Sequence, residues 1–244
     1  VVRLVGSEMC IRDSLYLDAI TVTGETIREI IEKSKYNWKQ EIIRKVENPI
    51  FDKGSIAVLK GNLAPGSAII KQSAASKDLL DHEGIVEVFE NLEDLANRID
   101  SDDLNVTKDS ILLLKNIGPI GAPGMPEAGL IPIPKKLAKQ GVKDMVRISD
   151  GRMSGTAAGT IILHVCPEAA AGGTLDIVKS GDIIRLDVKQ RLLELKLSDD
   201  EINIRKKNKK TKIKLNRRGY DKIFHESVLQ ADKGADFDFL RDLK

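Results

Sequence analysis

Residues able to do acid, base or metal chemistry gather in two segments rich in glycine and proline. Residues 116–134, NIGPIGAPGMPEAGLIPIP, carry one carboxylate, Glu127. Residues 147–160, RISDGRMSGTAAGT, place Ser154 and Thr156 in a turn after a short apolar run. Carboxylate oxygens suit Mg2+, and backbone N–H groups at a turn that leads into a helix stabilise anions. The small residues after Ser154 permit such a helix start, so the second segment indicates an anion-binding loop.

These residues also have ordinary interpretations. A single loop carboxylate is commonly solvated, and Ser, Thr and Asp form turns and caps throughout proteins. The second segment has neither the lysine of a P-loop nor the G-x-S-x-G order of a hydrolase elbow, so nucleotide hydrolysis and esterase chemistry gain no support. His164, in the apolar run IILHV, is interpreted as a satisfied core histidine, and His82 and His225 belong to no constellation.

Composition excludes several classes of protein. The 244 residues are 41% apolar, and 39 basic side chains nearly balance 37 acidic ones, which gives no charge-based reason for binding nucleic acid or a membrane surface. There is neither an apolar stretch of membrane-spanning length nor a secretory signal, so we expect a cytoplasmic protein. Cys10 and Cys166 are too few to ligate a metal cluster.

The first fifty residues are expected to lie outside the main domain. Residues 1–14, VVRLVGSEMCIRDS, resemble translated adapter sequence and are interpreted as a non-native leader, with a poorly ordered natural terminus as the alternative. A short amphipathic helix is predicted from Thr23, its candidate cap. Pro49 and Gly54 then indicate a boundary, which we place after residues 15–50.

The remaining chain predicts a mixed α/β domain at residues 51–203. Apolar runs separated by Gly, Pro and Asn predict strands, and two short amphipathic segments predict crossover helices, one capped by Asn91 and one with Pro134 in its first turn. Alternation at residues 184–188 and 193–197 predicts a hairpin with one solvated face. The predicted strands are SIAVLKG, AIIKQS, ILLLKNIG, DMVRIS and GTIILHV.

Residues 204–244 are predicted to form a basic connector and a tail helix. Ser198 followed by Glu201 has the spacing of a capping box, so a helix should begin there. Nine of the fifteen residues 204–218 are Lys or Arg. They are interpreted as a solvated connector, with a nucleic-acid-binding module as a competing hypothesis that predicts salt-sensitive binding. Helical spacing from Tyr220 to Val228 predicts a helix that docks on the body.

Several long motifs, in the same order, resemble the dihydroxy-acid and 6-phosphogluconate dehydratase family. The resemblance runs from about residue 15 to the C-terminus. It implies a C-terminal β-barrel swivelling domain flanked by helices, with residues 15–50 ending a cluster-binding N-terminal domain. The motifs are LKGNLAPGSAIIKQSAAS, GPIGAPGMPE, VRISDGRMSGTAAGTIILHVCPEAAAGGTL and SGDIIRLDV.

The resemblance also implies a reaction and its cofactors. The family removes water from a 2,3-dihydroxy acid to give a 2-keto acid, with an iron-sulfur cluster, 2Fe-2S rather than 4Fe-4S, and Mg2+, both held mainly by the N-terminal half. Ser154 matches the serine base, which needs a depressed pKa from Mg2+ or a helix N-terminus. Thr156 matches an orienting neighbour and Glu127 a Mg2+ ligand.

The resemblance finally bears on substrate and assembly. Residues 132–150 and the terminal QADKGADFDFL favour the sugar-acid branch, such as pentonate dehydratases, over the branched-chain pathway enzyme. Ala128, Cys166 and the dense lysines of residues 206–214 depart from expectation. The implied enzyme is a homo-oligomer, dimer or tetramer, and this chain alone should be inactive. The alternative is a non-catalytic swivelling or binding domain.

Overall fold

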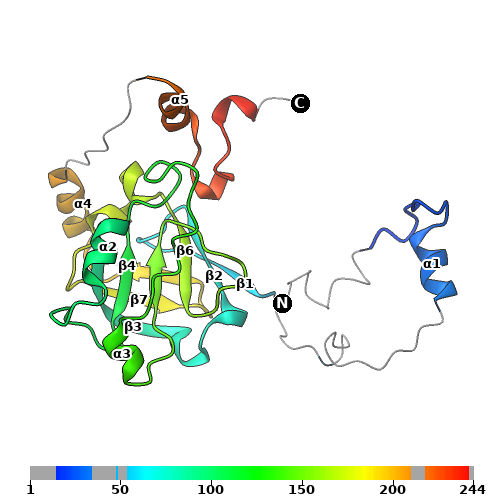
Figure 1. The fold of residues 1–244 in the computed structure, drawn as a ribbon. Helices are drawn as coiled ribbons and strands as arrows, with labels where there is room; N and C mark the ends of the chain where they lie inside the picture. The colour runs from blue at the N-terminus through cyan, green and yellow to red at the C-terminus, as the bar shows by residue number, and fades with distance from the viewer. Residues whose placement is uncertain (1–14, 35–47, 49–53, 210–217, 242–244) are drawn as a thin grey trace. The chain divides into compact units, whose positions relative to one another are not determined.

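The computed structural model describes residues 15–34, 48, 54–209 and 218–241 (Figure 1). The chain divides into two compact units, residues 1–55 and 56–244. The interpreted leader with Cys10 lies outside the described residues, and so do residues 210–217 of the Lys-rich run. Within the described part of the chain, no helix is long and apolar enough to cross a membrane.

The first unit contains one helix, α1 (Ile27–Lys33), among its described residues. The predicted cap was wrong by three residues, because Thr26, not Thr23, caps the helix. The Thr26 hydroxyl accepts the Glu29 N–H at 3.2 Å, and the Glu29 carboxylate accepts the Thr26 N–H at 2.8 Å. This reciprocal pair satisfies two N–H groups, an advantage that Thr23 lacks because the helix begins later.

Eight strands of the second unit form one sheet in the order β1-β2-β6-β5-β4-β3-β7-β8. Strands β3 to β6 run parallel to one another, and the other pairings are antiparallel. The bounds are β1 (Ile56–Leu59), β2 (Ser67–Lys71), β3 (Asp81–Phe89), β4 (Ile111–Leu114), β5 (Arg147–Ser149), β6 (Ile161–Cys166), β7 (Ile183–Asp187) and β8 (Leu192–Leu195).

The sheet curves until its two edge strands nearly meet. Lys60, directly after β1, donates its N–H to Arg191 O at 2.8 Å and accepts the Leu193 N–H at 2.9 Å. Asn62 adds two side-chain bonds to the backbone of Leu195, at 2.7 and 2.8 Å. These contacts cover the backbone groups that an open edge would expose. The predicted mixed α/β class with a barrel is confirmed.

Strand β3 is the longest strand and was not predicted. Its first half pairs with β7 and its second half pairs with β4, so the strand changes its pairing partner halfway along. Alternation between buried and exposed residues is therefore not maintained: Val88 and Phe89 are consecutive and both buried. The strand also begins with the polar residues DHEG, so it does not form a continuous apolar run in the sequence.

Two short helices cover one face of the parallel strands. Helix α2 (Leu92–Arg98) connects β3 to β4, and α3 (Lys135–Lys139) connects β4 to β5, so both are crossovers, as predicted. Asn91 caps α2 by accepting the Asp94 N–H at 2.9 Å. Pro134 lies at the cap position of α3, one residue ahead of the first turn where it was predicted.

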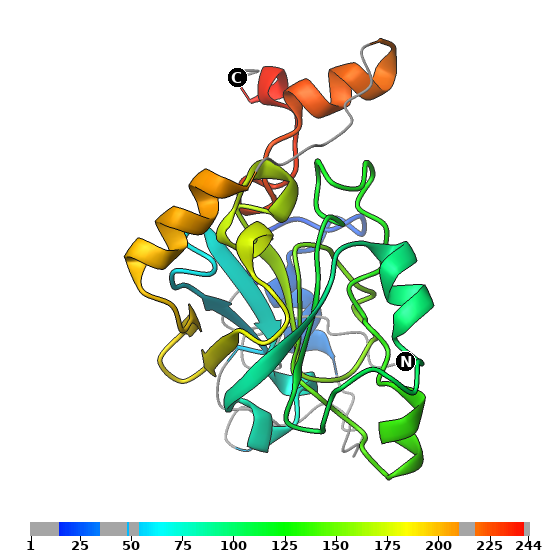
Figure 2. The ribbon, with the colours of Figure 1, turned by 90° about the vertical axis from the view of Figure 1, so that its left-hand side faces the viewer.

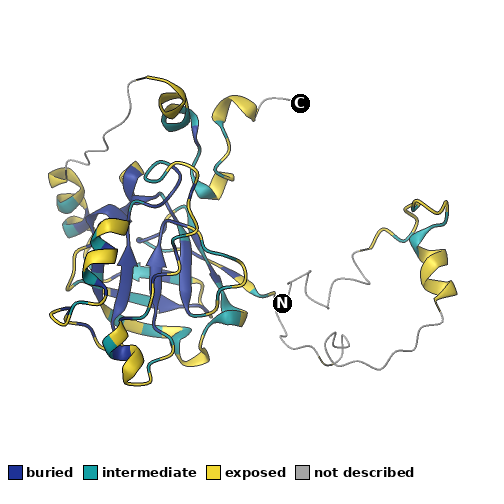
Figure 3. Ribbon diagram, in the orientation of Figure 1, coloured by how far each residue is buried: buried dark blue, intermediate teal, exposed yellow. Residues whose placement is uncertain are grey.

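The core has two parts, separated by the parallel strands. On β4, Ile111 and Leu113 face the barrel interior, whereas Leu112 and Leu114 face helices α2 and α3. Burial on both faces explains why this strand is an uninterrupted apolar run. Figure 3 shows the strands buried and the outer helix faces exposed. Burying each of these leucines contributes about 1.5–3 kcal/mol.

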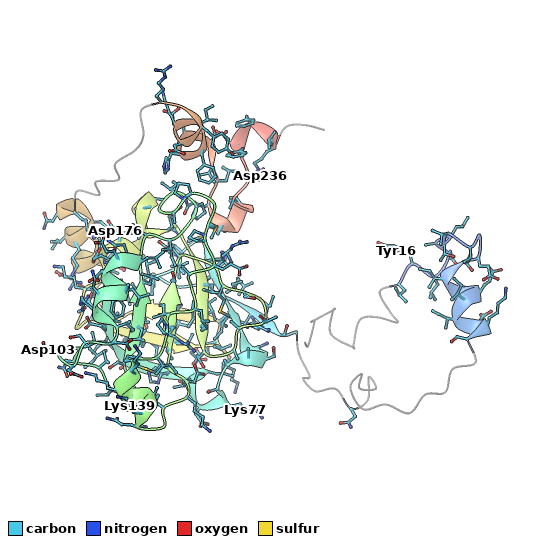
Figure 4. All side chains as sticks on the ribbon, in the orientation of Figure 1. Tyr16, Lys77, Asp103, Lys139, Asp176 and Asp236 are labelled. Atoms are coloured by element: carbon cyan, nitrogen blue, oxygen red, sulfur yellow. The ribbon has the colours of Figure 1, made fainter. Side chains whose placement is uncertain are left out.

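Helix α4 (Asp199–Asn208) uses part of the basic run to dock on the barrel. Ser198 caps it by accepting the Glu201 N–H at 3.2 Å, so the helix begins where predicted. Arg205 Nη1 lies 2.6 Å from Asp182 Oδ2, and Lys209 Nζ lies 2.8 Å from Asp176 Oδ1. Figure 4 shows Asp176 beside this helix. These two cations therefore belong to the fold rather than to a free basic surface.

The C-terminal segment, residues 218–241 and hereafter the tail, lies beyond one end of the sheet (Figures 1 and 2). It contains α5 (Tyr220–Ser227), and Val228 pairs with Phe237 so that the chain turns back. The rings of Phe224 and Phe237 meet edge to face, with centroids 5.7 Å apart. The 3-10 turns of the chain are Gln72–Ala74, Lys77–Leu79, Ala169–Ala171, Thr174–Ile177, Ala231–Lys233 and Asp238–Leu240.

Candidate active site

The carboxyl ends of parallel strands β4, β5 and β6 bring three loops together. The loop after β4 carries Glu127, the loop after β5 carries Ser154, and β6 ends at Cys166, just before Glu168. Because these strands are parallel neighbours, their ends share one edge of the sheet. Ligands of α/β proteins commonly bind at such an edge. The two segments singled out in the sequence therefore lie at one place in the fold.

Asp150 joins all three loops. Its carboxylate accepts the N–H groups of Asn116 at 3.1 Å, Ile117 at 3.0 Å and Ala169 at 3.0 Å. The side chain is 1% exposed, and burial raises its pKa to about 6, against the lowering effect of these N–H donors. A buried carboxylate with three backbone partners holds the loops in one arrangement.

Glu168 is a second buried carboxylate that holds the Glu127 loop. It accepts the N–H groups of Ile120 and Gly121, each at 2.9 Å, and it is 1% exposed. Burial is also the main reason that its pKa is raised. A Cβ on Gly118 would lie 2.6 Å from Glu168 Oε2, so only glycine lets the loop approach this closely.

Ser154 and Thr156 lie in contact on the loop after β5. Their hydroxyl oxygens lie 2.9 Å apart, and the Thr156 N–H donates to Ser154 Oγ at 3.4 Å. The expectation of a helix start here was wrong: the segment forms a turn, closed by a bond of 3.1 Å from the Ala157 N–H to Ser154 O. Gly159, at φ +126°, then leads the chain back into β6 and cannot continue a helix.

Arg152 connects the Ser154 loop to the Glu127 loop. Its Nε donates to Met125 O at 2.7 Å, and its carbonyl accepts the Gly129 N–H at 2.7 Å. Glu127 itself is about half exposed, and its carboxylate lies 3.8 Å from the Arg152 guanidinium. The three predicted site residues thus occupy adjoining loops, and Arg152 is the residue between them that the sequence reasoning did not name.

The described residues offer one candidate metal ligand rather than a complete metal site. Among the described residues, no three His, Cys, Asp or Glu side chains cluster in a way that could hold a metal ion. Glu127 offers exposed carboxylate oxygens, which fit Mg2+. Cys166 is buried at the end of β6, and burial raises the pKa of its thiol to about 11, which opposes its use as a thiolate ligand.

A cavity of about 360 Å3 opens beside Arg152, between the Glu127 loop and the tail. None of the three predicted site residues lines it. The sequence interpretation of His164 as a satisfied core residue was wrong: His164 lines this cavity, and its buried Nδ1 has no hydrogen-bond partner among the described residues. Six of its lining residues are Pro119, Met125, Arg152, His164, Phe224 and Val228.

The sequence reasoning also did not identify Asp150 and Glu168 as loop anchors. Both directly follow, or nearly follow, a buried parallel strand, and that position was the available signal. A carboxylate at the end of such a strand is commonly shielded from solvent, so it needs hydrogen-bond donors from the protein nearby. Here the donors are backbone N–H groups of loops distant in sequence, which no local pattern reveals.

Comparison with known proteins matches this fold and these loops to one family. The family model described as "Dihydroxy-acid/6-phosphogluconate dehydratase C-terminal" matches residues 41–235, which include the whole sheet, both site loops and most of the tail. The chain belongs to this dehydratase family. The resemblance seen in the sequence motifs is thereby confirmed.

Relatives in this family carry several dehydratase names. A putative dehydratase, IlvD1, of Rhizobium meliloti is 52% identical over 94% of this chain and 40% of its own length. An L-arabinonate dehydratase of Rhizobium leguminosarum is 46% identical over 93% of this chain and 39% of its own length. A dihydroxy-acid dehydratase of Acetivibrio thermocellus is 39% identical over 95% of this chain and 41% of its own length. The chain thus spans about 40% of the length of the curated relatives it matches.

Proposed function

We propose that this chain is the C-terminal part of a hydro-lyase that dehydrates a 2,3-dihydroxy carboxylic acid to a 2-keto acid. The observation that supports it most is the contact between the Ser154 and Thr156 hydroxyls, 2.9 Å apart, on a loop joined by Arg152 to the loop of Glu127. Family membership supplies the reaction class. The rest of the enzyme, with an iron-sulfur cluster, 2Fe-2S in this proposal, would lie in a preceding half.

Ser154 is the proposed base that takes the proton from C2 of the substrate. Its hydroxyl must become an alkoxide, since a neutral hydroxyl is too weak for an α-proton. The Thr156 N–H already donates to Ser154 Oγ, and the Thr156 hydroxyl can donate as well. Donation by both groups to the alkoxide is the proposed means of stabilising the anion. This turn therefore replaces the helix N-terminus expected from the sequence.

Glu127 is the proposed oxygen ligand that this chain contributes to Mg2+. Its carboxylate is half exposed and is held near Arg152 only at 3.8 Å, so it can turn toward an ion without losing a buried hydrogen bond. A Mg2+ ion held there would supply the Lewis acid that polarises the C3 hydroxyl, which takes up the proton that Ser154 removed from C2 and leaves as water. The resulting enol takes up a proton at C3 and releases its hydroxyl proton to become the 2-keto acid.

The substrate we propose is a sugar acid, such as a pentonate, rather than a branched-chain dihydroxy acid. The relative named L-arabinonate dehydratase is 46% identical to this chain, against 39% for the dihydroxy-acid dehydratase. The cavity beside Arg152 and the tail is the proposed pocket for the end of the substrate away from C2, because a cation and an imidazole line it whereas Ser154 does not. We further propose a homo-oligomeric enzyme of the cytoplasm.

The test is Ser154→Ala in the full-length enzyme that contains this chain, with Ser73→Ala, an exposed serine, as the matched control. We expect Ser154→Ala to abolish turnover of L-arabinonate while the visible absorbance of the cluster stays intact, and Ser73→Ala to keep wild-type turnover. Near-normal turnover in Ser154→Ala would refute the serine base. No turnover of any 2,3-dihydroxy acid by the wild type would favour a non-catalytic swivelling domain.

A further inference from the structure

His164 lies at a β-bulge in strand β6. Ser67 pairs with Cys166 and Ile69 pairs with Leu163, so β6 has one residue more than β2 in this interval. His164 takes a left-handed conformation, φ +53°, and its N–H donates to Gly151 O at 3.1 Å. Bulges next to active sites change the direction of a side chain. Gly151 belongs to the loop after β5, which also carries Ser154.

The imidazole of His164 is a buried polar group that the fold leaves incomplete. Its Nδ1 is buried without a hydrogen-bond partner in the described part of the chain, and the side chain lines the cavity next to Arg152. An unsatisfied buried nitrogen and a left-handed non-glycine residue each carry a cost in free energy. An apolar side chain in a regular strand would avoid both costs.

The surroundings of His164 determine which ligand group it can bind. Burial, and then the positive charge of Arg152, lower the pKa of the ring, so both favour its neutral form. A neutral imidazole offers one N–H donor and one acceptor nitrogen. A hydroxyl group, which can also donate or accept, fits either tautomer. A cation would be repelled by Arg152.

We propose that His164 is a substrate-binding residue, whose imidazole ring turns so that the unpartnered Nδ1 forms a hydrogen bond with a hydroxyl group of the dihydroxy acid in this cavity. The proposal rests on the proposed function. It explains the bulge, the left-handed residue and the unpartnered nitrogen together: the bulge directs the ring into the cavity, and the ligand completes its hydrogen bonding. His164 then anchors the substrate, whereas Ser154 reacts with it.

The experiment compares three His164 variants in the full-length enzyme with L-arabinonate as substrate. His164→Asn keeps a polar group near the place of Nδ1, and Asn accepts a positive φ readily. His164→Leu removes the polar group, and His164→Gly removes the whole ring without backbone strain. His82→Leu is the control, since His82 bonds to Asp109 O at 2.9 Å and lies outside the cavity lining.

We expect kcat/KM to fall about 10-fold or more in His164→Leu and His164→Gly, mainly through KM. His164→Asn should recover most of that loss, and added imidazole should lower KM in His164→Gly. An unchanged KM in both His164→Leu and His164→Gly would overturn the proposal, as would equal losses in all three variants without imidazole rescue. If the wild type turns over no 2,3-dihydroxy acid, the proposed function fails; if the wild type is active and only the His164 results are negative, this inference alone fails.

Discussion

Gln230 in the tail and Glu168 after β6 bind each other twice. The Glu168 N–H donates to Gln230 Oε1 at 2.8 Å, and Gln230 Nε2 donates to Glu168 Oε1 at 2.7 Å. The same carboxylate accepts the N–H groups of Ile120 and Gly121, on the loop that leads to Glu127. A single buried side chain therefore connects the tail to a proposed metal-binding loop.

Replacement of Gln230 by alanine should loosen the tail. The change removes two hydrogen bonds and leaves Glu168 with fewer partners, a loss of about 1–3 kcal/mol in local stability. Amide hydrogen exchange of residues 218–241 should become faster, and exchange at Ile120 and Gly121 should rise with it. Gln190→Ala, on an exposed turn, should change neither. Unchanged exchange in Gln230→Ala would show that the tail docks independently of Glu168.

Replacement of Thr156 by valine should slow turnover and shift its pH dependence. Valine keeps the N–H bond to Ser154 Oγ but removes the hydroxyl, so the serine alkoxide loses one donor. We expect kcat to fall about 10–100-fold. The ascending limb of the pH profile should move to higher pH, because the pKa of Ser154 rises. Thr156→Ser keeps the hydroxyl and should behave almost as the wild type.

Replacement of Glu127 by glutamine should raise the Mg2+ requirement of the full-length enzyme. The amide keeps the size of the side chain but lacks the negative charge that attracts the ion. The Mg2+ concentration for half-maximal turnover should rise at least about 10-fold. Glu93→Gln, on the exposed first turn of α2, serves as control and should not change it. An unaltered Mg2+ requirement in Glu127→Gln would remove Glu127 from the ligand set.

The stability of the chain should carry a pH dependence from Asp150. Burial raises its pKa from the ordinary 3.8 to about 6, so the folded state holds this proton more tightly than the unfolded state. The stability it contributes is fully present below pH 3.8 and is lost as pH rises through 6, by about 3 kcal/mol in total.

Urea unfolding of the wild type and Asp150→Asn between pH 4 and 7 measures this term. The asparagine does not titrate, so the difference in unfolding free energy between the two proteins should change across this window and level off above it. A constant difference would mean that Asp150 titrates alike in both states.

Closure of the barrel should depend on Gly61. A Cβ at this position would lie 2.0 Å from Leu193 O, on the strand that β1 must approach. Gly61→Ala should therefore separate the edge strands and destabilise the domain by about 2–4 kcal/mol. Gly54→Ala, where nothing lies within 4 Å of a Cβ, is the matched control for urea unfolding. Equal stability of the two variants would show that the barrel does not need this contact.

Local patterns predicted many elements because each is decided by residues close together in the chain. The caps Asn91 and Ser198 bind N–H groups three residues ahead, and the β7–β8 hairpin needs only its own alternation. The run ILLL of β4 is apolar on both faces, which is sufficient to predict a central strand. The long sequence motifs were likewise sufficient to identify the family.

Features that depend on distant partners were missed or misplaced. Strand β3 changes partners halfway along, and its pattern changes with them. His164 looked like a core residue, because the bulge at this position depends on the pairing of β6 with β2, which the local sequence does not reveal. Glu168 meets its N–H donors 47 and 48 residues away.

The amino-acid sequence by itself therefore determined the mixed α/β class, the family, the candidate residues Glu127, Ser154 and Thr156, and the helix caps. The tertiary structure alone decided which loops meet, which carboxylates hold them and where a cavity opens. The physical reason is the distance along the chain over which each interaction acts. Propensity, capping and alternation act over a few residues, whereas desolvation and backbone hydrogen bonding between loops depend on which strand ends the sheet topology makes neighbours.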